Sequence, residues 1–152
     1  MRIFAIAIAI LLVIISGAGG YWYFEIYQPK QFAREIVSIY VDFQRGIRSV
    51  APNHPTQDRS EIAAAVQRYE EVVQKTRDKL NTLKPPRKMK PIHKDFVEFL
   101  DAFQLFISNF KSGDFDQALS DKEQEQARRG NDLDSKMQEL IKTYPELKPM
   151  TQ

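Results

Sequence analysis

Residues 91–110, PIHKDFVEFLDAFQLFISNF, carry the most regular apolar pattern of the chain. Large apolar side chains recur there at intervals of three or four residues: Ile92, Phe96, Phe99, Phe103, Phe106 and Phe110. This spacing follows the 3.6-residue period of an α-helix and puts the rings on one face. Leu100 and Ile107 widen that face, so the pattern predicts the most buried helix of the domain. We interpret the rings as core packing rather than as a cofactor-binding surface.

Two similar stripes precede this helix. The first consists of Phe32, Ile36, Ile39, Phe43, Ile47 and Val50, and the second of Ile62, Val66, Tyr69, Val73, Thr76, Leu80 and Leu83. Segments 51–55 and 84–86, each with two prolines, follow the stripes. A proline cannot continue the hydrogen-bond ladder of a helix, so these segments should end the two helices.

A fourth helical stretch, residues 114–143, is apolar at both ends and polar in the middle. Gly130 lies in this polar middle and costs the helix about 1 kcal/mol relative to alanine. We expect one helix with a poorly buried centre; a break near Gly130 is the alternative. Residues 145–152 contain two prolines and should form an irregular tail.

Four amphipathic stretches with short connections predict an all-α fold, an antiparallel up-down-up-down four-helix bundle over residues 29–144. No run of alternating polarity bounded by turn residues predicts a strand. Pro29 should interrupt the helix that leads into the bundle, giving a kink or a short hinge.

Residues 3–24 contain no charged side chain and consist mainly of Ile, Ala, Leu and Val. At about 1.5 Å per residue, such a helix spans the ~30 Å hydrocarbon core of a bilayer. The aromatic residues near its end are typical of a membrane interface: Tyr21, Trp22, Tyr23 and Tyr27. We therefore predict that residues 1–28 form an uncleaved, single-pass transmembrane anchor. The alternative is a signal peptide cleaved near Ala18, which would leave a secreted or periplasmic domain.

The orientation that we favour places the N-terminus in the cytoplasm and the helical domain outside it. In an up-down-up-down bundle, the connection between the second and third helices then faces the membrane. This connection is the most basic stretch of the chain: Lys84, Arg87, Lys88, Lys90 and Lys94. Basic side chains next to an anionic bilayer contribute ~1 kcal/mol each. The sequence thus suggests a membrane-surface loop, with a solvated charged loop as the alternative.

Charge and composition exclude several classes of function. The 22 basic residues include Arg2, so the rest of the chain has 21 against 20 acidic residues, which argues against nucleic-acid binding. The absence of cysteine excludes disulfides, a thiol nucleophile and a lipidated cysteine. His54 and His93 lie in or beside proline-rich segments, and no metal, phosphate-loop or nucleophile motif is present. We predict no enzyme activity, no cofactor and no metal.

The last helical stretch is rich in acidic residues, and its polar middle is a possible partner face: Asp121, Glu123, Glu125, Arg128 and Arg129. A solvated helix surface is the alternative. The sequence therefore suggests a membrane-anchored bundle that acts by protein–protein binding, as an accessory or scaffold subunit of an envelope membrane complex. The alternative function is an extracytoplasmic sensor or carrier of a small apolar ligand, held among Phe96, Phe99, Phe103 and Tyr69. The oligomeric state stays open.

Overall fold

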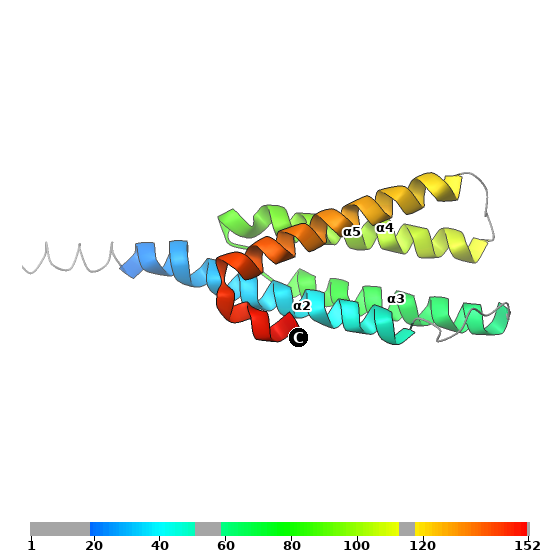
Figure 1. Ribbon diagram of the computed structural model, residues 1–152, viewed down its shortest axis with the longest axis horizontal. Coiled ribbons are helices and arrows are strands. Elements are labelled where there is room, and N and C mark those ends of the chain that lie inside the picture. Colours follow the sequence, from blue (N-terminus) through cyan, green and yellow to red (C-terminus); the bar gives the residue numbers. More distant parts are fainter. Residues whose placement is uncertain (1–18, 51–58, 113–117, 152) are drawn as a thin grey trace, which may run out of the picture.

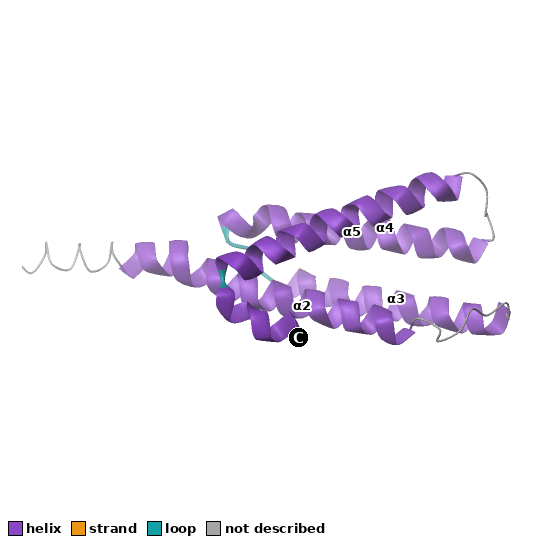
Figure 2. Cartoon of the chain, in the orientation of Figure 1, coloured by secondary structure: helices purple, strands orange, loops and turns teal. Residues whose placement is uncertain are grey.

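The computed structural model describes residues 19–50, 59–112 and 118–151. Within these ranges the chain is all-helical and contains no strand, which confirms the all-α part of the predicted fold (Figure 1; Figure 2). The elements are the π-helix η1 (Tyr23–Tyr27), the α-helices α2 (Gln28–Val50), α3 (Arg59–Thr82), α4 (Lys90–Ser112) and α5 (Ala118–Thr143), and the 3-10 helices η2 (Arg87–Met89) and η3 (Pro145–Thr151).

The four long helices run alternately away from η1 and back toward it (Figure 1). Helix α3 packs against both α2 and α4, and α5 packs against α4. The bundle therefore consists of two hairpins, α2–α3 and α4–α5, which diverge toward the end that lies away from η1 (Figure 1). The connection between α3 and α4 lies at the same end of the bundle as the start of α2.

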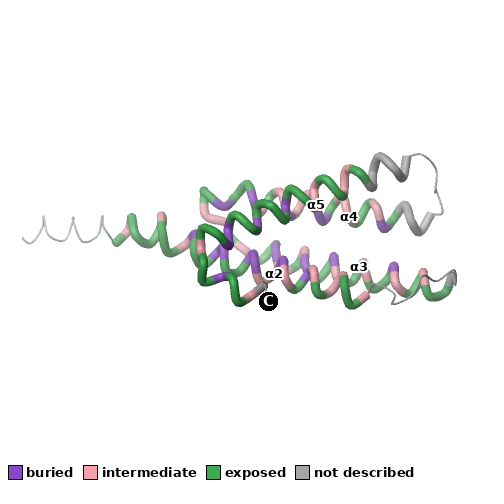
Figure 3. Tube along the Cα trace, viewed as in Figure 1, coloured by how far each residue is buried: buried purple, intermediate pink, exposed green. Residues whose placement is uncertain are grey.

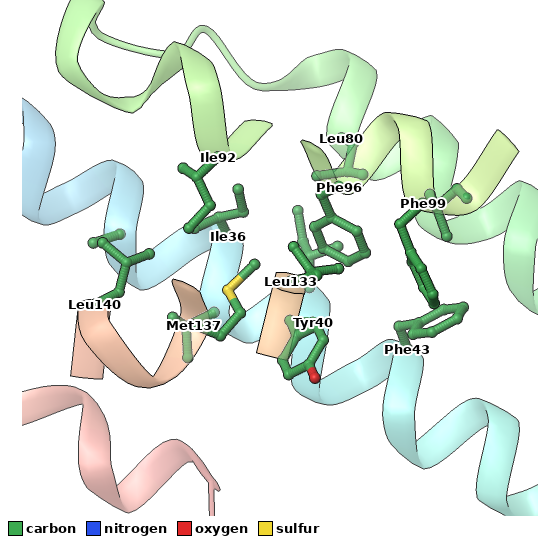
Figure 4. Packing of buried hydrophobic residues seen from close by; sticks show 14 of the residues in the cluster. Ile36, Tyr40, Phe43, Leu80, Ile92, Phe96, Phe99, Leu133, Met137 and Leu140 are labelled. Atoms are coloured by element: carbon green, nitrogen blue, oxygen red, sulfur yellow. The ribbon is translucent and has the colours of Figure 1, made fainter. Parts of the chain in front are cut away.

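The core is concentrated in the half of the bundle that adjoins η1 (Figure 3). Phe96 of α4 is fully buried, and the ring of Tyr40 meets it edge-to-face at 5.9 Å. Side chains of α5, including Leu133 and Met137, close the core from the opposite side (Figure 4). The buried side chains lie between Pro29 and Leu147. None of the described residues 19–28 is buried, so the core of the bundle, which we call the head, is built without them.

Residues 145–151 differ from the irregular tail that the sequence predicts. They form η3, which contacts both α2 and α5. Pro145 opens this element, where its missing N–H costs nothing. Leu147 is fully buried, and its backbone N–H donates to the carbonyl of Tyr144 at 2.9 Å. The element therefore fills the seam between the first and the last helix of the bundle.

Pro29 does not produce a hinge. The chain is helical from residue 19 through Val50, and the π-turn η1 ends immediately before α2. The N–H of Gln28 donates to the carbonyl of Tyr23, five residues back. This wider turn accommodates a proline, which lacks an N–H and whose ring clashes with the carbonyl four residues earlier.

Helix α5 continues through Gly130, as the preferred prediction for this stretch requires. A Cβ atom at Gly130 would lie 3.3 Å from the ring of Phe99. The missing side chain therefore allows a core ring of α4 to approach the backbone of α5. The predicted start of this helix, near residue 114, lies outside the described residues.

In the described part of the chain, no helix is both long and apolar enough to cross a bilayer. Residues 3–18, which make up most of the predicted anchor, lie outside that part. The described residues of the predicted span are 19–24.

Candidate functional site

The helix that leads into the bundle is surrounded by exposed apolar side chains. We call this group the aromatic collar; it consists of Tyr21, Trp22, Tyr23, Phe24, Ile26 and Tyr27. Their exposed fractions lie between 43% and 67%. The ring of Tyr27 stacks on Trp22 at 5.5 Å and on Tyr23 at 5.7 Å. Six of the seven residues 21–27 are apolar and are distributed over nearly two helical turns, interrupted by Glu25.

The predicted membrane-surface loop lies beside this collar. Lys84, Arg87, Lys88, Lys90 and Lys94 are all exposed. The Nζ atom of Lys88 forms an ion pair with the carboxylate of Glu25, the single charged residue within the collar segment. This hydrogen bond raises the pKa of Lys88. Lys94 lies one turn into α4 and pairs with Glu98 at 3.4 Å. The structure thus places the loop beside the end of the collar that adjoins the bundle (Figure 1).

A groove between α2 and η3 lies on another side of the same end, with a volume of about 490 Å³. We call it the α2–η3 groove; its lining consists of Tyr27, Lys30, Gln31, Arg34, Glu35, Glu146 and Leu147. Lys30 pairs with Glu146 at 2.8 Å and lowers the pKa of that carboxyl. Sequence reasoning missed this groove because one wall is built by a segment more than 100 residues away. The spacing of Tyr27, Lys30 and Arg34 on one helical face was the available signal.

The described residues of the predicted partner face form ion pairs within the molecule. Glu125 accepts hydrogen bonds from Arg129 at 2.7 Å and from Arg128 at 2.9 Å, and these bonds lower its pKa. Arg129 also donates to Glu98 of α4 at 2.9 Å. This network links α5 to α4. The side chains of Asp121 and Glu123 lie outside the described part, and a partner on this face stays a prediction.

The aromatic residues proposed to hold an apolar ligand contact one another. Phe43 lies edge-to-face against Phe99 at 5.6 Å and against Phe103 at 5.9 Å, and Tyr69 meets Phe103 at 6.4 Å. Phe96 is fully buried. These contacts are typical of a packed core. They favour the interpretation of the rings as structural, and the sensor or carrier function stays a prediction.

A buried hydroxyl links the two hairpins. Tyr40 of α2 donates to Asp134 of α5 at 2.9 Å and accepts from Gln44 at 2.7 Å. Burial, followed by the hydrogen bond to Asp134, raises the pKa of Tyr40 well above its ordinary value of 10.0. This contact joins two helices whose backbones are less closely packed than those within each hairpin.

His93 is the histidine that the structure describes. The Nε2 atom of His93 lies 3.0 Å from the carbonyl of Leu80, in the last turn of α3, where this contact completes a helix end. His54 lies outside the described residues. Across residues 19–50, 59–112 and 118–151, no group of three or more His, Asp or Glu side chains could hold a metal ion.

Comparison with protein families, with curated proteins and with solved structures finds no match to this chain. Three features meet at the end of the bundle from which η1 leaves: the aromatic collar, the membrane-surface loop and the α2–η3 groove.

Proposed function

We propose that the protein is a single-pass membrane protein whose helical head binds a protein partner as an accessory or scaffold subunit of an envelope membrane complex. Residues 3–24 remain in the bilayer, with the N-terminus in the cytoplasm and the head outside it. The aromatic collar carries this proposal, because six exposed apolar side chains, interrupted by Glu25 alone, are distributed around the helix just where the uncharged run of residues 3–24 ends. A docking site for one protein would need only one apolar face, whereas lipid surrounds a helix completely.

The level of the basic loop supports the same placement. The ion pair between Lys88 and Glu25 keeps this loop beside the collar, where a bilayer would present its headgroups. Exposed lysine and arginine side chains are attracted to anionic headgroups within a Debye length of the surface. The head would therefore rest on the membrane rather than extend from it on a hinge.

Binding is the activity proposed for the head. Charged side chains of α4 and α5 line a cleft of about 210 Å³. Several of them are paired with one another, as Glu98, Glu125 and Arg129 illustrate. A small head held beside a bilayer is suited to meeting other proteins of the same membrane. The region around residues 121–129 is the candidate face.

Membrane insertion is tested by extracting membranes that contain the full chain with alkaline carbonate and by measuring the intact mass of the purified protein. We expect the chain to stay in the pellet with the mass of all 152 residues. A mature chain that begins near residue 19 and is released by carbonate would refute the anchor.

The basic loop is tested separately with a truncated chain that starts at Gln28, because the core lies between Pro29 and Leu147. Flotation with anionic vesicles at low salt should show binding. Replacing Lys84, Arg87, Lys88 and Lys90 by Gln should weaken it roughly 100-fold or more. The matched control replaces four exposed basic residues of other surfaces by Gln and removes the same charge: Arg45, Arg48, Arg68 and Lys75. Equal weakening in both variants would refute a specific role for the loop.

The partner is tested in intact membranes with photo-crosslinking amino acids placed at Asp121 and Glu123, and at Gln67 of α3 as a control. Crosslinks from Asp121 and Glu123 to the same membrane protein in repeated experiments would support the candidate face. Adducts from Gln67 alone would move the binding surface to α3.

A further inference from the structure

The α2–η3 groove combines two cations and two carboxylates next to the aromatic collar. Lys30 and Arg34 follow Tyr27 on one face of α2, and Glu35 and Glu146 supply the negative charges. In a helix, the Cα–Cβ bonds tilt toward the N-terminus. The two basic side chains therefore lean toward the collar, which is the side on which the bilayer is proposed to lie.

The distances along α2 match the thickness of a headgroup layer. Lys30 and Arg34 lie three and seven residues beyond Tyr27, which corresponds to about 4.5 Å and about 10 Å along the helix. The headgroup and interfacial regions add about 5–8 Å to each side of the hydrocarbon core. A long side chain of Arg34 can cover the remaining distance.

The hydrogen bonds of the groove leave binding capacity on these cations. Lys30 pairs with Glu146 at 2.8 Å, and an ammonium has three donors, so it can also bind a phosphate oxygen. Within the described residues, no carboxylate lies within 4.0 Å of the guanidinium of Arg34. Glu35 accepts one hydrogen bond, from Gln31 at 3.2 Å, and keeps further acceptor positions.

We propose that the α2–η3 groove binds the headgroup of a zwitterionic, amine-bearing phospholipid. Lys30 and Arg34 bind the phosphate, and the carboxylates of the groove bind the ammonium. The balance of two cations and two anions favours this headgroup over one that carries only negative charge. Tyr27 lies beside the glycerol region, where its ring contacts the upper part of the acyl chains. This inference rests on the proposed membrane anchoring, and the experiment separates the two.

The experiment places the full chain in phosphatidylcholine vesicles that contain a small amount of photoreactive phosphatidylethanolamine. A parallel sample contains photoreactive phosphatidylglycerol. After irradiation, mass spectrometry maps the labelled peptides. We expect phosphatidylethanolamine to label the segments around residues 27–35 and 145–148, and phosphatidylglycerol to label them several-fold less. Adding water-soluble phosphoethanolamine should leave the labelling unchanged. Loss of labelling would show that the groove binds a free phosphate ester and would overturn its assignment to a lipid headgroup.

Two variants test the roles of the side chains. Arg34→Gln should lower labelling by phosphatidylethanolamine about fivefold. Arg45→Gln, which changes an exposed arginine near the other end of α2, should leave it unchanged. Glu146→Gln should reduce the preference for phosphatidylethanolamine over phosphatidylglycerol. Equal labelling by both probes, or unchanged labelling in Arg34→Gln, would overturn this inference.

Flotation of the same vesicles distinguishes the two proposals. A chain that floats with the vesicles but labels equally with both probes retains its anchor and lacks the headgroup site. A chain that does not float overturns the anchor and the headgroup site together.

Discussion

Replacing Leu147 by alanine tests whether η3 belongs to the folded head. The side chain is fully buried between α2 and α5, although it lies close to the end of the chain. Leu→Ala at fully buried positions costs about 3–5 kcal/mol, because the lost transfer energy adds to the energy of the cavity that remains. For a chain of this size, about 3 kcal/mol lowers the melting temperature by roughly 10 °C.

The assay is urea unfolding of the chain that starts at Gln28, followed by circular dichroism at 222 nm. The matched control is Leu105→Ala on α4, because this leucine is 52% exposed and should cost less than about 1 kcal/mol. Both variants should keep the same dependence of the free energy of unfolding on urea concentration. A cost below about 1 kcal/mol for Leu147→Ala, or equal costs in the two variants, would show that η3 detaches without disturbing the bundle.

Three further changes test other contacts of the head. Tyr40→Phe should lower the free energy of unfolding by about 1 kcal/mol at pH 7, as measured by chemical denaturation, because it removes the hydrogen bond to Asp134. The same variant should lose less stability than the wild type above pH 10, where the unfolded chain releases the Tyr40 proton and the folded chain retains it, so that the stability of the wild type falls as pH rises. Gly46→Ala should destabilise the bundle by about 1 kcal/mol, since the new Cβ would lie 2.8 Å from a methyl group of Val72 and overpacking exceeds the gain in helix propensity. The double variant Gly46→Ala, Val72→Ala should lose less free energy of unfolding than the sum of the losses in the two single variants. Strict additivity would contradict a direct clash between the two side chains.

The periodic features of the fold were predictable from the sequence. The stripe of residues 91–110 predicted the most buried helix, and Phe96 and Leu100 are fully buried. Among the described residues, however, α2 contributes more buried side chains than α4, because it packs against α3 and η3 as well. The position of the basic loop followed from the up-down order of the helices, and the ion pair between Lys88 and Glu25 agrees with it. Such predictions succeed because side-chain periodicity and chain order alone determine them.

Features that depend on distant segments were not predictable. Leu147 is buried in part by α2, which precedes it by about 100 residues or more. Local rules for a proline-rich tail therefore predicted an irregular segment. The rule for proline correctly marked Pro29 as a disturbance, but only the structure shows that a π-turn absorbs it. The charge run around Glu125 suggested a partner face; its pairing with Arg128 and Arg129 follows from helical spacing, whereas the bond from Arg129 to Glu98 requires tertiary structure.

The unbroken helix from residue 19 through Val50 has a mechanical consequence. Its 32 residues form a rod about 48 Å long, and no hinge separates the part that bears the collar from the part that enters the head. A 10° inclination of such a rod displaces its far end by about 8 Å, and an axial rotation turns the surfaces of the whole head by the same angle. If the collar is seated in lipid, changes in bilayer thickness or in the packing of neighbouring spans would reorient the head as one rigid body.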